Sequence, residues 1–117
     1  PASARGWILL SSLLAEREPM KAAAALTLGL ELAPREYYLI PPRVAAGAKL
    51  WRHLAPDARE RVLGDARSLL TDQHAYPMVR RLLAAPGGPA LVTRSFAGRP
   101  EELRAFNRRM TRERLGL

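Results

Sequence analysis

The sequence predicts an all-α protein, a single domain over residues 1–117 in which six or seven short helices form antiparallel hairpins. Three observations favour this fold class. Apolar residues recur at helical spacing along almost the whole chain. Ten prolines divide the chain into short segments, and several stand where a helix would begin. The composition, 48% hydrophobic and 26% charged, is typical of a globular domain with a core.

Seven segments carry the helical pattern. The first spans about 4–16, and its apolar stripe is Trp7, Leu10 and Leu14, widened by Leu13. The second spans about 19–32 and contains four consecutive alanines, which favour a helix and let a neighbouring helix approach closely. The other helices are expected at about 42–54, 56–70, 77–85, 90–96 and 99–113.

Two segments are ambiguous in this pattern. Residues 37–40 fit a short strand or a helical turn, and the prolines that follow exclude a long element there. Residues 90–96 fit a helix or a strand, and their helical neighbours favour a helix. The segment 56–70 is the most regular: we expect Asp65 on its solvent face, with Arg61 spaced to pair with both Asp57 and Asp65.

The positive charge is concentrated near the C-terminal end. The net charge is +8, of which residues 1–79 contribute +2 and residues 80–117 contribute +6. In the last predicted helix Arg104, Arg108 and Arg112 are spaced i, i+4, i+8, and Arg109 lies beside them. Such a helix can bind phosphates, lipid headgroups or an acidic groove, or its arginines can form an ordinary solvated face.

Enzymatic and metal-binding motifs are missing from the sequence. The absence of cysteine excludes disulfides, zinc–thiolate sites and thiol catalysis. The chain has no phosphate-binding loop, no H-E-x-x-H, no G-x-S-x-G and only two histidines, His53 and His74. No apolar run approaches the roughly 20 residues that a spanning helix needs. We therefore expect no catalytic residue, no metal site and no cofactor.

Tyr37 and Tyr38 are the aromatic residues best placed to contact a partner. They are adjacent, lie in a predicted connection and stand beside two prolines. Aromatic residues in connections are frequent contact residues, although one tyrosine could instead fill the core. Arg43 and Arg52, on the next predicted helix, would add polar contacts on the same inner surface.

Residues 5–34 resemble a tetratricopeptide repeat, a hairpin of two helices. The resemblance covers about a quarter of the chain; its turn at 17–19 is shorter than usual and lacks glycine, and no second unit follows at the 34-residue period. The resemblance implies a right-handed stack of such hairpins that acts as a scaffold and binds another protein. The matching positions are Trp7, Leu10, Ser11, Leu14, Ala22, Leu26, Gly29, Leu30 and Pro34.

A looser resemblance concerns the cellular setting. Residues 43–54 and the helix after them are similar to repeat-bearing domains of bacteria with GC-rich genomes. This implies a cell-envelope or polysaccharide assembly, with the chain periplasmic or membrane-associated. Because the chain starts at Pro1, we expect a removed leader or a piece of a longer, membrane-anchored protein.

The sequence therefore supports two classes of function. The first is a non-enzymatic protein-interaction module whose partner is a peptide or a helix, with self-association as a way to cover terminal apolar faces. The second is a basic protein that binds nucleic acid, or an accessory subunit that meets an anionic membrane surface. We prefer the first, with Tyr37, Tyr38, Arg43, Arg52 and the four arginines of the last helix as partner-binding residues.

Overall fold

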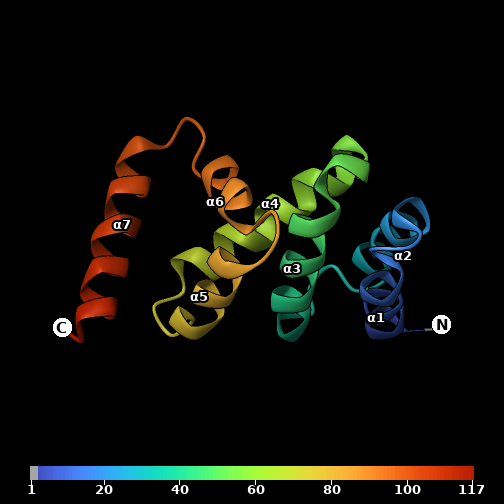
Figure 1. Ribbon diagram of the computed structural model, residues 1–117, viewed down its shortest axis with the longest axis horizontal. Helices are drawn as coiled ribbons and strands as arrows, with labels where there is room; N and C mark the ends of the chain where they lie inside the picture. Colours follow the sequence, from blue (N-terminus) through green and yellow to red (C-terminus); the bar gives the residue numbers. More distant parts are fainter. Residues whose placement is uncertain (1–2) are drawn as a thin grey trace.

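The computed structural model describes residues 3–117 and is all-helical over that range, with no strand among these residues (Figure 1). Seven α-helices alternate with short connections, and two of these connections are single turns of 3₁₀-helix. The elements in chain order are α1 (Ala4–Leu14), α2 (Pro19–Leu32), η1 (Tyr37–Leu39), α3 (Ile40–Leu50), η2 (Trp51–His53), α4 (Pro56–Thr71), α5 (Tyr76–Ala84), α6 (Gly88–Ser95) and α7 (Pro100–Leu115).

Proline sets most of the helix starts. Six of the seven helices, α2 to α7, have a proline in their first two positions, where the missing N–H costs no hydrogen bond. The first helix is capped differently: the Ser3 hydroxyl accepts a 3.0 Å hydrogen bond from the Gly6 backbone N–H. The ambiguous segments are a 3₁₀ turn at Tyr37–Leu39 and a helix at Gly88–Ser95.

The helices follow one another along an elongated molecule of 43 × 25 × 24 Å. The α1–α2 hairpin lies at one end and α7 at the other, with α3 to α6 between them (Figure 1). The termini therefore lie at opposite ends of the long axis. This arrangement exposes one side of both terminal elements.

Small residues bring α1 and α2 together. Ser11 and Ala22 have no exposed surface, and a Cβ on Gly29 would lie 2.8 Å from Cγ1 of Ile8. The predicted stripe on α1 is partly wrong, because Ile8 and not Trp7 fills this interface and Leu13 is 80% exposed. The helices are too close for an indole between them, so Trp7 lies at the half-buried flank of α1.

The central core is built on α3 and α4. Val44, Val62, Val79 and Leu91 are completely buried and bring together α3, α4, α5 and α6. A Cβ on Gly47 of α3 would lie 2.5 Å from Cγ1 of Val62, so the two helices touch closely at this point. The core is therefore continuous through the middle of the molecule.

The connection between α5 and α6 packs closely against the end of α3. Gly87 has a φ of 75°, and a Cβ there would lie only 2.2 Å from the carbonyl oxygen of Ala48. Glycine is required at this position by both its backbone angle and its surroundings. The predicted loop at Pro86–Pro89 thus has a packing role as well as a turn conformation.

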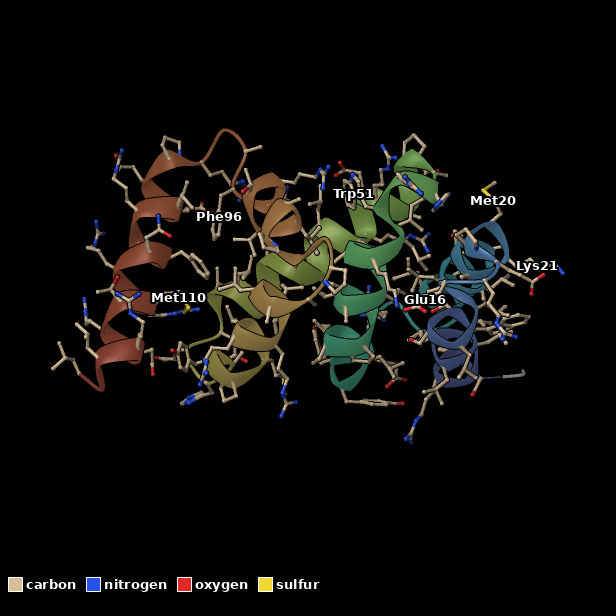
Figure 2. The ribbon with its side chains drawn as sticks, in the orientation of Figure 1. Glu16, Met20, Lys21, Trp51, Phe96 and Met110 are labelled. Carbon is tan, nitrogen blue, oxygen red and sulfur yellow. The ribbon has the colours of Figure 1, made fainter. Side chains whose placement is uncertain are left out.

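The last helix is attached through a few long side chains. The rings of Phe96 and Phe106 lie 5.2 Å apart, and Arg109 of α7 donates a 2.6 Å hydrogen bond to the carbonyl oxygen of Leu70 at the end of α4. Figure 2 shows Phe96 and Met110 in the space between α7 and the remaining helices. Because these contacts are few, α7 is the least supported helix of the fold.

Candidate functional site: a groove below two tyrosines

The most exposed aromatic residues of the protein stand side by side on η1. Tyr37 is 77% exposed and Tyr38 is 69% exposed. The next two residues, Leu39 and Ile40, are buried and hold this turn against the core. Neither tyrosine fills the core, which agrees with the interpretation of both as surface residues.

Three adjoining hollows extend from these tyrosines across α3, α4 and α5, and we call them together the tyrosine groove. The middle hollow, of about 520 Å³, shares Tyr37, Ile40 and Ser68 with a neighbour of about 340 Å³. On the other side it adjoins a hollow of about 280 Å³. Those two hollows have Pro41, Leu69 and Met78 in common.

The wall of the groove is mainly apolar, with isolated charges. Arg61 lines the hollow at one end and Arg81 the hollow at the other. Neither guanidinium has an ion-pair partner within residues 3–117. Asp72 lines the middle hollow, and its Oδ1 accepts a 2.8 Å hydrogen bond from the backbone N–H of His74. The ends of the groove are therefore cationic.

The floor at the Arg61 end holds a buried ion pair. Arg43 donates from Nε to Oδ2 of Asp65 at 2.7 Å and from Nη2 to Oδ1 at 3.0 Å, and from Nη1 to the carbonyl oxygen of Ala33 at 2.6 Å. Burial raises the pKa of Asp65 above its ordinary value of 3.8, while the hydrogen bonds and charge of Arg43 act against this rise.

This ion pair corrects two predictions. The side chain of Arg43 is only 2% exposed, so this residue holds helices together and offers no open contact to a partner. Asp65 does not face solvent, because its side chain is 15% exposed and its carboxylate is engaged by Arg43 rather than by Arg61. Helical spacing within α4 could not reveal a partner 22 positions away in the chain.

Arg52 lies away from the groove. It is on η2, whereas the tyrosines are on η1, and the eleven residues of α3 separate these two turns. A helix of that length is about 16 Å long. Arg52 is exposed and its Nε lies 3.2 Å from Nε2 of His53. The structure therefore does not bring Arg52 and the tyrosines into one site.

The half-buried Trp51 packs against arginine side chains from two helices. Two guanidinium groups lie over its ring, that of Arg59 at 5.3 Å and that of Arg94 at 4.9 Å from the ring centre. Arg59 also donates a 3.0 Å hydrogen bond from Nε to the backbone carbonyl of Trp51. The tryptophan thus links η2 with α4 and α6 by cation–π contacts.

The basic residues of α7 divide into two groups. Arg104, Arg108 and Arg112 are exposed, and Arg104 forms an ion pair with Glu101 one turn earlier. Arg109 is half-buried, lies 5.8 Å from the centre of the Phe106 ring and bonds to Leu70 as described above. The guanidinium of Arg109 therefore attaches α7 to α4, while its role as a partner-binding residue stays a prediction.

A second concavity lies between α5 and the C-terminal half of α7. Its volume is about 810 Å³, and it is lined from both helices by apolar and charged side chains. Its lining includes Tyr76 and Arg80 from α5 and Met110 and Arg114 from α7. The guanidinium of Arg80 lies over the Tyr76 ring at 5.9 Å, so part of this surface is already occupied by an internal contact.

No family model, curated protein or solved structure matches the chain. Its site must therefore be judged by its chemistry. Over residues 3–117 no group of three histidine, cysteine, aspartate or glutamate side chains could hold a metal ion. Over the same range no helix is long and apolar enough to cross a membrane.

Several groove residues were not identified from the sequence. The sequence pattern gives no sign that Ile40, Pro41, Leu69 and Met78 line a groove, and it pairs Arg61 with Asp57 and Asp65. The apolar pattern of a helix as short as α5 cannot distinguish a core position from a groove wall. The available signal is the adjacent Tyr37–Tyr38 pair, which the structure places on the lining of the middle hollow.

Proposed function

We infer that the chain is a non-enzymatic protein-interaction module that binds a peptide in the tyrosine groove. The observation that carries this proposal is the pair of exposed tyrosines at the edge of a continuous, mainly apolar groove. A tyrosine combines a large apolar ring with a hydroxyl, and it loses little conformational entropy when a partner covers it. Apolar grooves of this kind bind peptides through a few inserted side chains.

The charges at the groove indicate the class of peptide. Arg61 and Arg81 stand at its two ends without ion-pair partners in the described part of the chain. A matching peptide carries two or three apolar side chains in its middle and acidic residues near both ends. Each fully buried apolar side chain contributes about 1.5–3 kcal/mol before the costs of association are subtracted.

The resemblance to a tetratricopeptide repeat supports the same class of function. Ser11, Ala22 and Gly29 lie in the α1–α2 interface, where a repeat hairpin needs small residues. The hairpin stack and a bacterial cell-envelope or polysaccharide assembly remain the architecture and setting that we propose for this module.

Selection of random twelve-residue peptides displayed on phage, against the purified chain, tests the proposal. We expect enriched sequences with an apolar centre and acidic ends. Synthetic copies then provide dissociation constants by fluorescence anisotropy. The matched probe is the same peptide with its acidic residues changed to lysine, which should bind at least tenfold more weakly.

Two variants locate the binding site. Gly64→Leu places a side chain in the 340 Å³ hollow, where a Cβ has no neighbour within 4 Å, so the fold should tolerate it. Tyr37→Ala/Tyr38→Ala removes the rim. Both should weaken binding at least tenfold, whereas Leu115→Ala/Leu117→Ala, which also removes two exposed large side chains, should not. The absence of any enriched peptide, or affinity unchanged by both groove variants, would contradict the proposal.

The exposed arginines of α7 favour a second candidate function, binding to nucleic acid or an anionic membrane. Arg108 and Arg112 are exposed and have no ion-pair partner in the described chain. A salt titration of binding to mixed RNA and to vesicles containing phosphatidylserine, with Arg104→Gln/Arg108→Gln/Arg112→Gln as the comparison, tests it. Steep salt dependence that is lost in the triple variant is the expected result for this function.

A further inference from the structure

The outer face of α2 is apolar and uncovered. Met20 is 69% exposed, Leu32 is 54% exposed and Leu28 is 39% exposed. Ala24 is exposed on the same side of the helix. Figure 2 shows Met20 and Lys21 at the outer edge of the hairpin, on the side away from α3. No other helix of the structure packs on this face.

Charges of opposite sign stand at the two ends of this face. Lys21 lies two residues after the start of α2, and Glu31 lies one residue before its end. Both side chains belong to exposed residues. Lys21 also pairs with Glu18 at 2.9 Å, a contact between exposed side chains that a second acidic partner can share.

The residues on this face of α2 match the same face of a second copy that runs in the opposite direction. When two identical helices pack antiparallel around a two-fold axis, the positions that meet have a constant sum. An axis level with position 26 places Met20 against Leu32 of the second copy and Lys21 against Glu31 of the second copy. The same axis places Ala24 against Leu28 of the second copy, so that a small residue receives a large one near the centre.

We propose that the chain forms a symmetric dimer in which the outer face of α2 packs antiparallel against the same face of a second copy. The occupant is a second copy because apolar, small and charged positions all match under one symmetry operation. The interface is separate from the tyrosine groove, because Leu30, the residue of α2 that lines the groove, is buried, whereas the residues of the outer face are exposed.

Sedimentation equilibrium over a range of protein concentrations measures the dimer directly. We expect a concentration-dependent transition from 12.9 kDa to twice that mass. Ala24→Arg should abolish the dimer, because the new side chain occurs twice near the axis. Its circular dichroism should be unchanged, since position 24 is exposed in the monomer and arginine favours helices.

Exchange of the two charges tests the antiparallel register. Lys21→Glu and Glu31→Lys should each weaken the dimer about tenfold, because both symmetric contacts become repulsive. The double variant Lys21→Glu/Glu31→Lys restores both pairs with reversed sign and should recover most of the affinity. Arg108→Glu and Glu60→Lys, which change the net charge equally at exposed positions elsewhere, should have little effect.

The proposal fails under either of two results. A chain that stays monomeric at millimolar concentration overturns it, as does a dimer that persists in Ala24→Arg. A dimer whose dissociation constant does not respond to either charge reversal overturns the antiparallel pairing. Loss of peptide binding in the groove variants would not affect these measurements, so the two proposals are tested independently.

Discussion

Arg43 and Asp65 form a two-point ion pair that connects α3 with α4, with distances of 2.7 Å from Nε to Oδ2 and 3.0 Å from Nη2 to Oδ1. The third hydrogen bond of Arg43 reaches the Ala33 carbonyl after the end of α2. One side chain thus joins three helices at the floor of the tyrosine groove. Pairing is required there because an isolated buried guanidinium would be strongly destabilising.

Removal of the carboxylate should destabilise the protein more than removal of the whole pair. Asp65→Leu leaves the 2%-exposed Arg43 without its counter-charge and should lower the free energy of unfolding by about 3–5 kcal/mol. Arg43→Met/Asp65→Leu should recover most of this loss, because neither buried charge remains. Urea denaturation of both single variants and the double variant measures the coupling. Additive losses would show that the pair has no energetic role.

The contribution of Asp65 to the free energy of unfolding should change with pH in a defined direction. Because burial raises its pKa above 3.8 in the folded state, the folded protein binds this proton more readily than the unfolded chain. The free energy of unfolding contributed by Asp65 therefore falls as pH rises from below 3.8 through the raised pKa. We expect nuclear magnetic resonance titration to give a pKa above 3.8. In Asp65→Asn this part of the pH dependence should disappear. A pKa below 3.8 would mean that Arg43 outweighs burial.

Two helical glycines should respond oppositely to alanine. In Gly47→Ala the new Cβ would lie 2.5 Å from Cγ1 of Val62, so we expect a loss of about 1–3 kcal/mol in the free energy of unfolding. In Gly64→Ala nothing lies within 4 Å, and the higher helix propensity should add about 0.5–1 kcal/mol. Thermal or urea unfolding measures both. Equal effects would indicate that α3 and α4 are not in close contact at Gly47.

The attachment of α7 should depend on Phe106. Its ring is 5.2 Å from that of Phe96, and α7 has few other contacts with the rest of the protein. In Phe106→Ala we expect amide hydrogen exchange along Pro100–Leu115 to accelerate at least tenfold, while α3 and α4 retain their protection. Arg108→Ala, at an exposed position of the same helix, is the matched control. Uniform acceleration throughout the chain would instead show that α7 unfolds together with the core.

Local sequence patterns predicted the secondary structure closely. Pro19 and Leu32 bound the second helix as expected, and the fourth helix ends at Thr71, one residue beyond the prediction. The second helix begins at Pro19 and ends two residues before Pro34, because proline fixes a backbone angle and lacks an N–H wherever it occurs. The surface position of Tyr37 and Tyr38 was also within reach, since the prolines after them exclude a long buried element.

The sequence by itself determined an all-helical chain and the approximate limits of its helices. Only the tertiary structure decided that Arg43 is buried against Asp65, that Arg109 attaches α7 to α4, and that Ile8 rather than Trp7 faces α2. The physical reason is the distance along the chain between the groups that interact. Helix boundaries depend on neighbours within one turn, whereas the role of a long charged side chain depends on groups 22 or 39 positions away, which only packing brings within hydrogen-bond distance.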